Sequence, residues 1–381
     1  LIRDAVRTPF GRDGGALSGI RADDLAALPV GHLAQRCNVK IDEVILGATN
    51  QAGEDNRNVA RMAVLLSGLP VSTPGVTVNR LCGSGSEALV QAARLVRCGE
   101  ARLVIAGGVE SMSRAPFVVE RSSRALDRDL RTHRTTVGWR MINPRLPRHW
   151  TDSLGACAER VAVTRGVTRD AMDEWAYRSH VRAAQAWDSG FHREWVLPLA
   201  DLTRDESVRP DISIDALAQL NPAFTEAGSI TAGNASPVSD GAVAVILGTD
   251  EQAGDSEPAL GQIVASATVG VEPDEFAIAP IIAMRALLHR QGLTWTDISV
   301  VEIQEAFASV VLACLAEEPH LNVERVNPFG GALALGHPLG ASAARLVVDA
   351  CRALRFRGGG WGIASICIGV GQGQAVLVRV D

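Results

Sequence analysis

The chain has 381 residues and a mass of 40.2 kDa, with 47% apolar and 21% charged residues. Its 43 acidic and 37 basic side chains give a formal charge of −6, which argues against a nucleic-acid-binding protein because such proteins carry a basic excess. Its apolar stretches are all shorter than the ~20 residues of a membrane span, which excludes a transmembrane-helix protein. We therefore expect a large globular protein without nucleic-acid or membrane partners.

The cysteines indicate a reducing compartment. There are seven of them, an odd number, and they are spread along the chain rather than clustered as in a disulfide framework. No close-spaced Cys and His pairs indicate a zinc site, so we expect no metal. The first residues, Leu1 to Phe10, include charged side chains and do not resemble a secretory signal peptide. We expect a cytoplasmic location.

Strand-like and helix-like segments alternate along the chain and are joined by glycine-rich turns, which is typical of an α/β protein. The expected strands lie at 44–46, 76–81, 103–106, 242–247, 298–303, 362–367 and 375–380. The expected helices lie at 56–67, 86–96, 154–163, 169–189, 305–315 and 342–354. Because the second part repeats the alternation of strands and helices in the first, we expect two similar halves that share a sheet or a tight interface.

A long insertion separates the two halves. Between residues 120 and 148 the periodicity disappears and arginine accumulates, at Arg121, Arg124, Arg128, Arg131, Arg134, Arg140, Arg145 and Arg148. Long loops in compact domains are often functional. This segment is interpreted either as a solvated or subunit-contacting loop, or as a lid that binds phosphates or a carboxylate. We divide the chain into a first half (1–118), a loop domain with the return to that half (119–240) and a second half (241–381).

Cys82 is the strongest candidate for chemistry. It follows an expected buried strand and directly precedes a helix, where unpaired amides and the helix dipole favour a thiolate and lower the thiol pKa. The neighbouring glycines Gly83 and Gly85 let a carbonyl group approach the backbone, whose amides could form an oxyanion hole. On its own, a cysteine at a tight strand–helix turn is more often structural than catalytic.

Two further residues occupy similar junctions. His337 lies in the rigid turn Gly336-His337-Pro338-Leu339-Gly340 before a helix, where it could serve as the base for a thiol. Cys367 ends an expected buried strand before a glycine-rich turn. Each residue has a structural alternative, a turn histidine bonded to local backbone or a small core residue. Together they predict a cysteine-nucleophile acyl-transfer enzyme. The glycine-rich turns match neither a dinucleotide-binding fingerprint nor a Walker loop.

At these residues the sequence resembles the thiolase family, which cleaves or forms 3-oxoacyl-CoA, over essentially the whole chain. The matching segments are 6–11, 79–85, 107–113, 231–236, 330–340 and 367–373. Within the family the chain is most similar to the 3-oxoadipyl-CoA (β-ketoadipyl-CoA) thiolases of aromatic-compound breakdown. That similarity is carried by residues 21–25, 50–63, 114–118 and 135–144.

The resemblance implies the thiolase fold, with two βαβαβαββ halves in a five-layered αβαβα core and an inserted loop domain over the active site. It implies Cys82 as the acyl-accepting nucleophile and His337 as its base. Cys367 would exchange the proton at the α-carbon of the acetyl unit, or reprotonate the leaving enolate in cleavage. The backbone amides of Cys82 and Gly369 would hold the thioester oxygen of the acyl-enzyme. The acyl group on Cys82 divides the reaction into two ping-pong steps.

The resemblance also implies a CoA site and an oligomer. The residues implied for CoA binding are Arg209, Ser236, Leu220, Leu154 and Phe307. CoA and acyl-CoA are substrates, and no metal or redox cofactor is required. A homodimer or homotetramer is implied as well.

The sequence departs from the family pattern at several positions. The usual Asn-Glu-Ala-Phe motif begins here with Gln304, whose side chain is longer by one bond of about 1.5 Å. The asparagine normally positions a water that, with the histidine, stabilises the enolate oxygen. Either Gln304 donates directly in place of that water, or this oxyanion hole is impaired. Ala277 and Ala279 replace glycines, Ala216 replaces a serine that often assists CoA binding, and the segment 317–326 is short.

Three functions are compatible with these observations. The first is a degradative thiolase acting on 3-oxoadipyl-CoA or a similar 3-oxoacyl-CoA. The second is a biosynthetic condensing enzyme with an altered oxyanion hole. The third is a catalytically weak homologue that binds acyl-CoA or a partner protein. Gln304 favours the third, whereas the retained Cys82, His337 and Cys367 oppose it.

Overall fold

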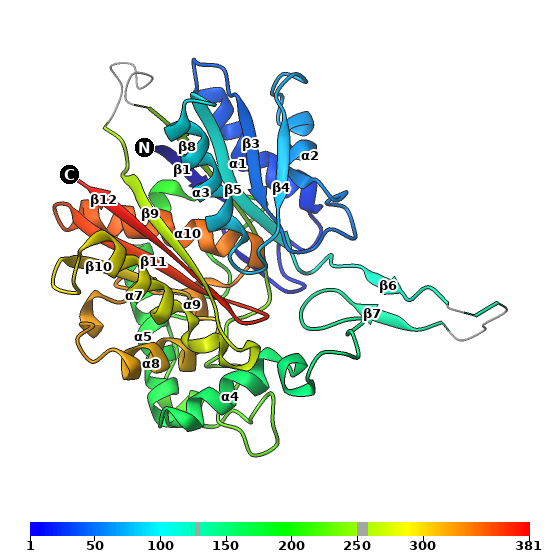
Figure 1. The fold of residues 1–381 in the computed structure, drawn as a ribbon, viewed down its shortest axis with the longest axis vertical. Helices are drawn as coiled ribbons and strands as arrows, with labels where there is room; N and C mark the ends of the chain where they lie inside the picture. The colour runs from blue at the N-terminus through cyan, green and yellow to red at the C-terminus, as the bar shows by residue number, and fades with distance from the viewer. Residues whose placement is uncertain (123, 126–129, 250–257) are drawn as a thin grey trace.

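The computed structural model describes residues 1–122, 124–125, 130–249 and 258–381 (Figure 1). One sheet has the strand order β1-β8-β5-β3-β4, and β2 pairs with β8. Its strands are β1 (Ile2–Arg7), β2 (Gly11–Arg12), β3 (Glu43–Gly47), β4 (Gly75–Val78), β5 (Leu103–Ser111) and β8 (Ser239–Gly248). β3 runs parallel to β4 and β5, and β8 runs antiparallel to β5 and β1. The parallel strands are typical of a sheet covered by helices on both faces.

A second sheet has the order β10-β11-β12-β9. Its strands are β9 (Gln262–Gly270), β10 (Ile298–Ile303), β11 (Gly360–Ile368) and β12 (Gln372–Val380). β10 and β11 are parallel, whereas β12 is antiparallel to both of its neighbours. β11 ends at Ile368, directly after Cys367, and the tight turn to β12 contains Gly369 and Gly371. Read from β9, the second sheet has the order β9-β12-β11-β10, which repeats the order and directions of β1-β8-β5-β3 in the first sheet. Among the described strands, β4 has no counterpart in the second sheet.

The described elements form five layers, αβαβα. The outer layer over the first sheet contains α1 (Ala22–Arg36) and α2 (Val59–Leu66), and the layer outside the second sheet contains α7 (Ala279–Gln291). Between the sheets lie α3 (Ser84–Cys98) and α10 (Leu339–Phe356), which contact each other and strands of both sheets (Figure 1). α10 is buried on nearly every side, as expected of a helix enclosed by two sheets. The predicted thiolase layering is confirmed.

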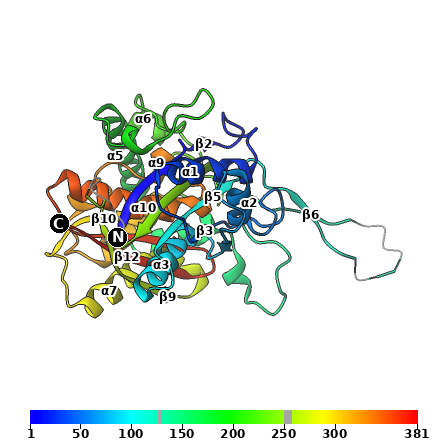
Figure 2. The ribbon, with the colours of Figure 1, turned by 90° about the horizontal axis from the view of Figure 1, so that it is seen from above.

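The insertion folds beside this core. It contains β6 (Phe117–Val119), β7 (Thr132–Arg134), η1 (Arg148–Thr151), α4 (Leu154–Thr164), α5 (Arg169–Asp188), η2 (Arg193–Trp195) and α6 (Ile214–Ala218). The side chains of Ser153 and Thr168 cap the first amides of α4 and α5, which fixes where both helices begin. The β6–β7 hairpin projects away from the body of the molecule (Figures 1 and 2).

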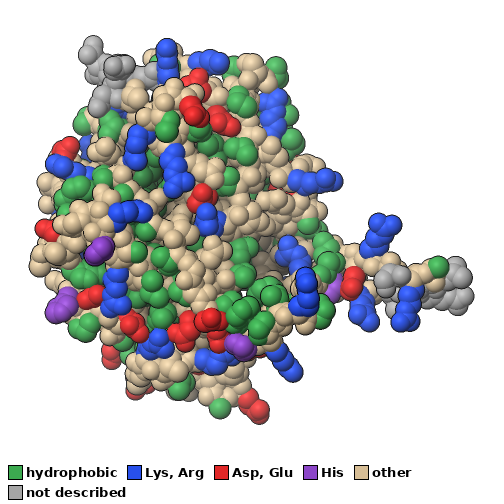
Figure 3. All heavy atoms as spheres, in the orientation of Figure 1, with side chains coloured by type: hydrophobic (Ala, Val, Ile, Leu, Met, Phe, Trp, Pro, Cys, Tyr) green, Lys and Arg blue, Asp and Glu red, His purple; other side chains and the backbone are tan. Residues whose placement is uncertain are grey.

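The described arginines of the segment 120–148 lie on the surface. Figure 3 shows basic side chains along the projecting hairpin and beside its base. The exposed ones are Arg121, Arg124, Arg131, Arg134, Arg140, Arg145 and Arg148. Arg128 lies outside the described residues. Across the described ranges, no helix is both long enough and apolar enough to cross a membrane.

The structure corrects three expectations. The second half was expected from residue 241, but β8 pairs with β5 and β1, so residues up to Gly248 belong to the first sheet. The strand expected at 76–81 covers only Gly75–Val78 and is half-buried, because β4 lies at a sheet edge. The helix expected at 305–315 begins later, as α8 (Ala308–Glu317), because Phe307 has an extended backbone.

The remaining elements are η4 (Pro273–Ile278), η5 (Val323–Arg325) and α9 (Ala332–Leu335). Besides several short elements, β1, α1, α7 and β9 were not predicted from the sequence. Pro29 lies inside α1, and Pro280 lies in the first turn of α7. Proline is a strong signal against a helix interior, although it fits the first turn well.

Candidate active site

Cys82 lies in a strained turn between β4 and α3. Leu81, the residue before it, has a φ of 48°, in the left-handed region that non-glycine residues rarely adopt. The Leu81 amide donates to Oδ1 of Asn79 at 2.9 Å, and the Arg80 amide donates to Oγ of Ser84 at 2.9 Å. These bonds hold the strained backbone in place. Strain of this kind is concentrated at functional sites.

Close packing between two helices brings His337 toward Cys82. A Cβ built on Gly85, in the first turn of α3, would lie 2.7 Å from the carbonyl oxygen of Gly340, in the first turn of α10. The two helices can therefore meet only because Gly85 lacks a side chain. Cys82 lies three residues before Gly85, and His337 lies three residues before Gly340. The contact thus places both residues at one pair of adjoining helix N-termini.

Glu110, near the end of β5, supports this junction from the first sheet. Its buried carboxylate accepts hydrogen bonds from the amide of Gly340 at 2.9 Å, from both the amide and hydroxyl of Thr49, and from the amide of Asn50. Burial raises the pKa of Glu110, while these hydrogen bonds act in the opposite direction. Glu110 therefore fixes the turn that carries His337 against the ends of β3 and β5.

The Cys82 thiol is not the low-pKa group that we expected. Burial raises the pKa of Cys82 to about 11, although hydrogen bonds from the backbone amides of Gly369 and of Cys82 itself favour the thiolate. Removal of the sulfur from water outweighs the helix N-terminus. The resting group is therefore a thiol that needs a base. The two amides that reach its sulfur are the pair expected to form an oxyanion hole.

His337 is buried beside Ser342. Nδ1 of His337 lies 2.6 Å from Oγ of Ser342, and the His337 amide donates to Oγ of Ser239 at 3.1 Å. Burial lowers the pKa of His337 to about 3, and the charge of Arg345 acts in the same direction. The imidazole is therefore neutral at pH 7, which is the state required of a base. Its Nε2 is buried and has no hydrogen-bond partner among the described residues.

Cys367 lies at the end of β11, near Cys82. A Cβ on Gly83 would lie 2.5 Å from Cδ1 of Ile368, so the end of β11 packs against the start of α3. Burial raises the pKa of Cys367 well above its ordinary value, and Cys82 is among the nearby groups that act in the same direction. The structure thus brings two thiols to the same junction of sheet and helix.

Gln304 follows β10 and is completely buried. Its backbone amide donates to the carbonyl oxygen of Ser365 at 2.9 Å, which ties it to β11. Neither Nε2 nor Oε1 of its side chain has a hydrogen-bond partner within the described part of the chain. Because a buried polar group without a partner is costly, such an amide commonly serves a ligand or an ordered water.

A cavity of about 350 Å³ lies between the segments 207–220 and 232–237. Arg209 and Leu220, two of the residues expected to bind CoA, line it together with Ala216 and His180. Ser236 adjoins this wall, but its hydroxyl donates to the carbonyl oxygen of Ala306 at 3.0 Å. Because Ala216 itself lines the cavity, an alanine in place of the serine of the family pattern leaves the cavity wall without that hydroxyl.

The other two expected CoA residues lie near the same region. Phe307 is buried and packs edge-on against Phe224, with ring centroids 5.5 Å apart. Leu154 begins α4, and a Cβ on Gly369 would lie within 3.8 Å of Leu154 and 3.5 Å of Leu81. Leu154 therefore adjoins the amide of Gly369 that reaches the sulfur of Cys82.

Three neighbours of the site were not singled out from the sequence: Glu110, His180 and Ser342. Glu110 belongs to a quoted family segment, so its position could have drawn attention. Burial lowers the pKa of His180 to about 4, and its Nδ1 accepts a hydrogen bond from the Arg209 amide at 3.1 Å. Nothing in the sequence pattern of α5 distinguishes His180 from a core residue.

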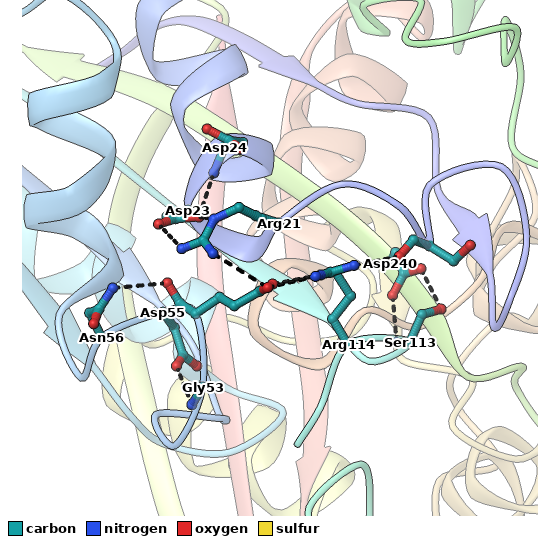
Figure 4. Close-up of polar contacts among 11 residues, drawn as sticks. Arg21, Asp23, Asp24, Gly53, Asp55, Asn56, Ser113, Arg114 and Asp240 are labelled. Carbon is teal, nitrogen blue, oxygen red and sulfur yellow. Dashed lines mark hydrogen bonds and ion pairs between the residues drawn. The ribbon is translucent and has the colours of Figure 1, made fainter. Parts of the chain in front are cut away.

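Three of the four segments that carry the finer resemblance meet in one ion-pair cluster. Two guanidinium nitrogens of Arg114, Nε and Nη2, each lie 2.6 Å from a carboxylate oxygen of Glu54 (Figure 4). Arg21 forms an ion pair with Asp23 at 2.8 Å and another with Glu54 at 3.4 Å. Next to Arg114, Ser113 donates to Asp240. The segments 21–25, 50–63 and 114–118 thus stabilise one another. Because the pairs are partly exposed, each contributes little to stability.

A buried thiol that receives two backbone amides, close to a neutral histidine and a second thiol, defines a cysteine-dependent acyltransferase. No group of three or more His, Cys, Asp or Glu side chains in the described ranges is arranged to hold a metal ion. The comparisons with known proteins identify the family. The thiolase N-terminal domain model matches residues 1–251, and the thiolase C-terminal domain model matches residues 257–380. The chain belongs to the thiolase family.

Individual relatives agree with this assignment. The chain is 46% identical to the beta-ketoadipyl-CoA thiolase of Acinetobacter baylyi, over 99% of this chain and 98% of that protein. It is 47% identical to the beta-ketoadipyl-CoA thiolase of Pseudomonas aeruginosa, over 100% of this chain and 98% of that protein. It superimposes on human mitochondrial 3-ketoacyl-CoA thiolase in complex with CoA with a TM-score of 0.91, at 34% identity over 99% and 96% of the two chains.

Proposed function

We propose that this thiolase cleaves 3-oxoadipyl-CoA with CoA, and yields acetyl-CoA and a shortened acyl-CoA. Two beta-ketoadipyl-CoA thiolases are 46% and 47% identical to the chain over nearly its full length, which supports this substrate. The observation that carries the mechanism is the contact between Gly85 and Gly340, because it places Cys82 and His337 at adjoining helix ends.

In the first half-reaction, Nε2 of His337 accepts the proton of Cys82. With pKa values of about 11 and about 3, the resting pair is a neutral thiol and a neutral imidazole. Proton transfer before attack is strongly uphill at about 1.4 kcal/mol per pKa unit, so it is coupled to attack on the substrate. The sulfur adds to the 3-oxo carbon, the bond between carbons 2 and 3 breaks, and the acyl group stays on Cys82.

The departing acetyl-CoA enolate takes a proton from Cys367. The raised pKa of that thiol keeps it protonated and therefore able to act as the acid. In the second half-reaction, the thiol of CoA gives its proton to the Cys367 thiolate and attacks the thioester on Cys82. The shortened acyl-CoA leaves, and the sulfur of Cys82 recovers its proton from His337. The amides of Cys82 and Gly369 hold the oxygen of each tetrahedral intermediate.

Gln304 donates from its amide to the enolate oxygen, in place of the asparagine-bound water of the family pattern. Its buried side-chain amide lacks a partner among the described residues, which supports this role. CoA occupies the cavity beside Arg209 and Leu220, with its pantetheine passing Ser236, Phe307 and Leu154 toward Cys82. No metal or redox cofactor takes part in these steps.

We also propose a homodimeric or homotetrameric protein in the cytoplasm. The projecting β6–β7 hairpin supports a role of the insertion in contacts between subunits, because an isolated hairpin has little apolar area of its own to bury. A solvated loop or an anion-binding lid remains the alternative for its arginines.

The test is the cleavage of 3-oxoadipyl-CoA and of acetoacetyl-CoA by the purified protein, followed by the loss of 3-oxoacyl-CoA absorbance, with Cys82→Ala as the control. We expect CoA-dependent cleavage that the control lacks and that favours 3-oxoadipyl-CoA. Acylation of Cys82 without cleavage would instead support the condensing or acyl-CoA-binding functions. Acylation and cleavage have to be measured separately because Gln304 replaces the asparagine of the family pattern.

A further inference from the structure

Ser342 lies one turn into α10 and is completely buried. Its Oγ lies 2.6 Å from Nδ1 of His337 and donates to the carbonyl oxygen of Pro338 at 2.9 Å. The second contact is the bond of a helical serine to the carbonyl four residues earlier, which holds the side chain in one rotamer. Ser342 therefore presents a fixed oxygen to the ring of His337.

The number of hydrogen bonds determines which ring nitrogen carries the proton. Ser342 has a single hydroxyl proton. If Nδ1 of His337 is protonated, it donates to Oγ while the hydroxyl donates to Pro338, which makes two bonds. If Nε2 is protonated, the hydroxyl must turn from Pro338 to Nδ1, which makes only one. The additional bond contributes about 0.5–1.5 kcal/mol, so the Nδ1–H tautomer is favoured roughly two- to tenfold.

The surroundings of Nε2 leave the preference to Ser342. Nε2 is buried and has no hydrogen-bond partner, donor or acceptor, among the described residues. It is therefore unpaired in either tautomer, and the contacts of Nδ1 decide between the two. An unprotonated Nε2 holds a lone pair that is available for the proton of the nucleophile.

We propose that Ser342 is a positioning residue that holds His337 in the Nδ1–H tautomer, so that Nε2 is the base. This inference rests on the proposed function of His337. In the step, the S–H bond of Cys82 breaks and an N–H bond forms at Nε2 as the sulfur bonds to the 3-oxo carbon, leaving an imidazolium and the oxyanion of the tetrahedral intermediate. The imidazolium keeps its Nδ1–H bond to Oγ of Ser342, so the hydroxyl acts as an acceptor throughout.

The test combines a spectrum with kinetics. Proton–nitrogen correlation spectra of histidine-labelled protein distinguish protonated from unprotonated ring nitrogens, and the His337 signals are assigned by their loss in His337→Asn. We expect the Nδ1–H form in the wild type and a mixture of tautomers in Ser342→Ala. We expect kcat of Ser342→Ala to fall about 10- to 100-fold, part of the usual contribution of a general base, with KM for CoA unchanged.

Ser309→Ala is the matched control. Ser309 is a completely buried serine of α8 whose hydroxyl has no partner within the described residues. Its loss should leave both kcat and the His337 signals unchanged. An Nε2–H form in the wild type would overturn the inference even if Ser342→Ala failed to fold, and so would an unchanged kcat and tautomer in Ser342→Ala. The spectrum also separates the two proposals, because it needs no turnover.

Discussion

Replacement of Gln304 by methionine should lower activity without lowering stability. Methionine has a similar length and no hydrogen-bonding amide, and Gln304 is buried with neither side-chain polar atom partnered within the described residues. Each unsatisfied buried polar group costs about 1–3 kcal/mol, so the free energy of unfolding should stay constant or rise by that amount. Loss of an oxyanion donor should reduce kcat by about 10²- to 10³-fold.

The assay pairs thiolytic cleavage of 3-oxoadipyl-CoA with urea unfolding, and Gln374→Met serves as the matched control. Gln374 is also buried, but its Nε2 donates to Glu87 at 2.9 Å and to Thr268 at 3.2 Å, and its Oε1 accepts from Ser86. Gln374→Met leaves Glu87, Thr268 and Ser86 without these hydrogen bonds. We expect it to lose about 1–3 kcal/mol of stability and to keep the kcat of its folded fraction.

Two results would refute the reasoning about Gln304. An unchanged kcat in Gln304→Met would mean that the amide does not serve the reacting oxygen. A loss of stability as large as that of Gln374→Met would mean that the amide is bonded within the native protein. Gln304→Asn tests how far the side-chain amide must reach. It withdraws the amide by about 1.5 Å, so we expect it to retain only part of kcat.

Asp205→Asn should destabilise the fold by about 3–5 kcal/mol in urea unfolding, because it leaves the buried Arg7 guanidinium, 2.6 Å away, without a counter-charge; an unchanged midpoint would contradict this. Desolvation lowers the pKa of three buried histidines, His180, His192 and His337, to about 4, 4 and 3. Below pH 6.5 the unfolded chain binds protons at these histidines that the native state does not bind. The free energy of unfolding should therefore fall from pH 6.5 toward pH 4, by up to about 4 kcal/mol per pH unit. A free energy of unfolding that stays constant over this range would refute the prediction. Because burial raises the pKa of Cys82 to about 11, its alkylation by iodoacetamide, measured by mass spectrometry, should keep accelerating between pH 8 and 10, and a plateau near pH 8 would be inconsistent with that value.

Much of the alternation of strands and helices could be predicted, because buried strands and amphipathic helices leave a local periodicity. The segment at 298–303 is β10 within the same bounds. Pro29 inside α1 argues against a helix there, whereas Pro280 lies in the first turn of α7, where proline fits, and does not explain why α7 was missed. β8 was assigned to the wrong half because strand pairing is not a local property. The pairing of β8 with β5 and β1 joins residues more than a hundred positions apart.

In the candidate site, too, some features could be predicted from the sequence and others depend on the packing of the whole chain. Cys82, His337 and Cys367 could be recognised because each stands at a turn beside glycines, and because the surrounding motifs resemble one family. The direction of the Cys82 pKa shift was predicted incorrectly. The helix N-terminus is a local feature, whereas the desolvation that raises the pKa to about 11 comes from the surrounding packed elements.

Residue types, their local spacing and the family motifs were thus enough to predict the α/β class and the family and to propose the three principal site residues. These properties depend on short-range patterns and on motifs written in the chain. The tertiary structure was needed to assign β8 to the first sheet, to show that the Cys82 thiol is protonated at rest and to show that Ser342 faces the ring of His337. Each of these depends on which atoms are brought together and which are removed from water, and the packing of the whole chain controls both.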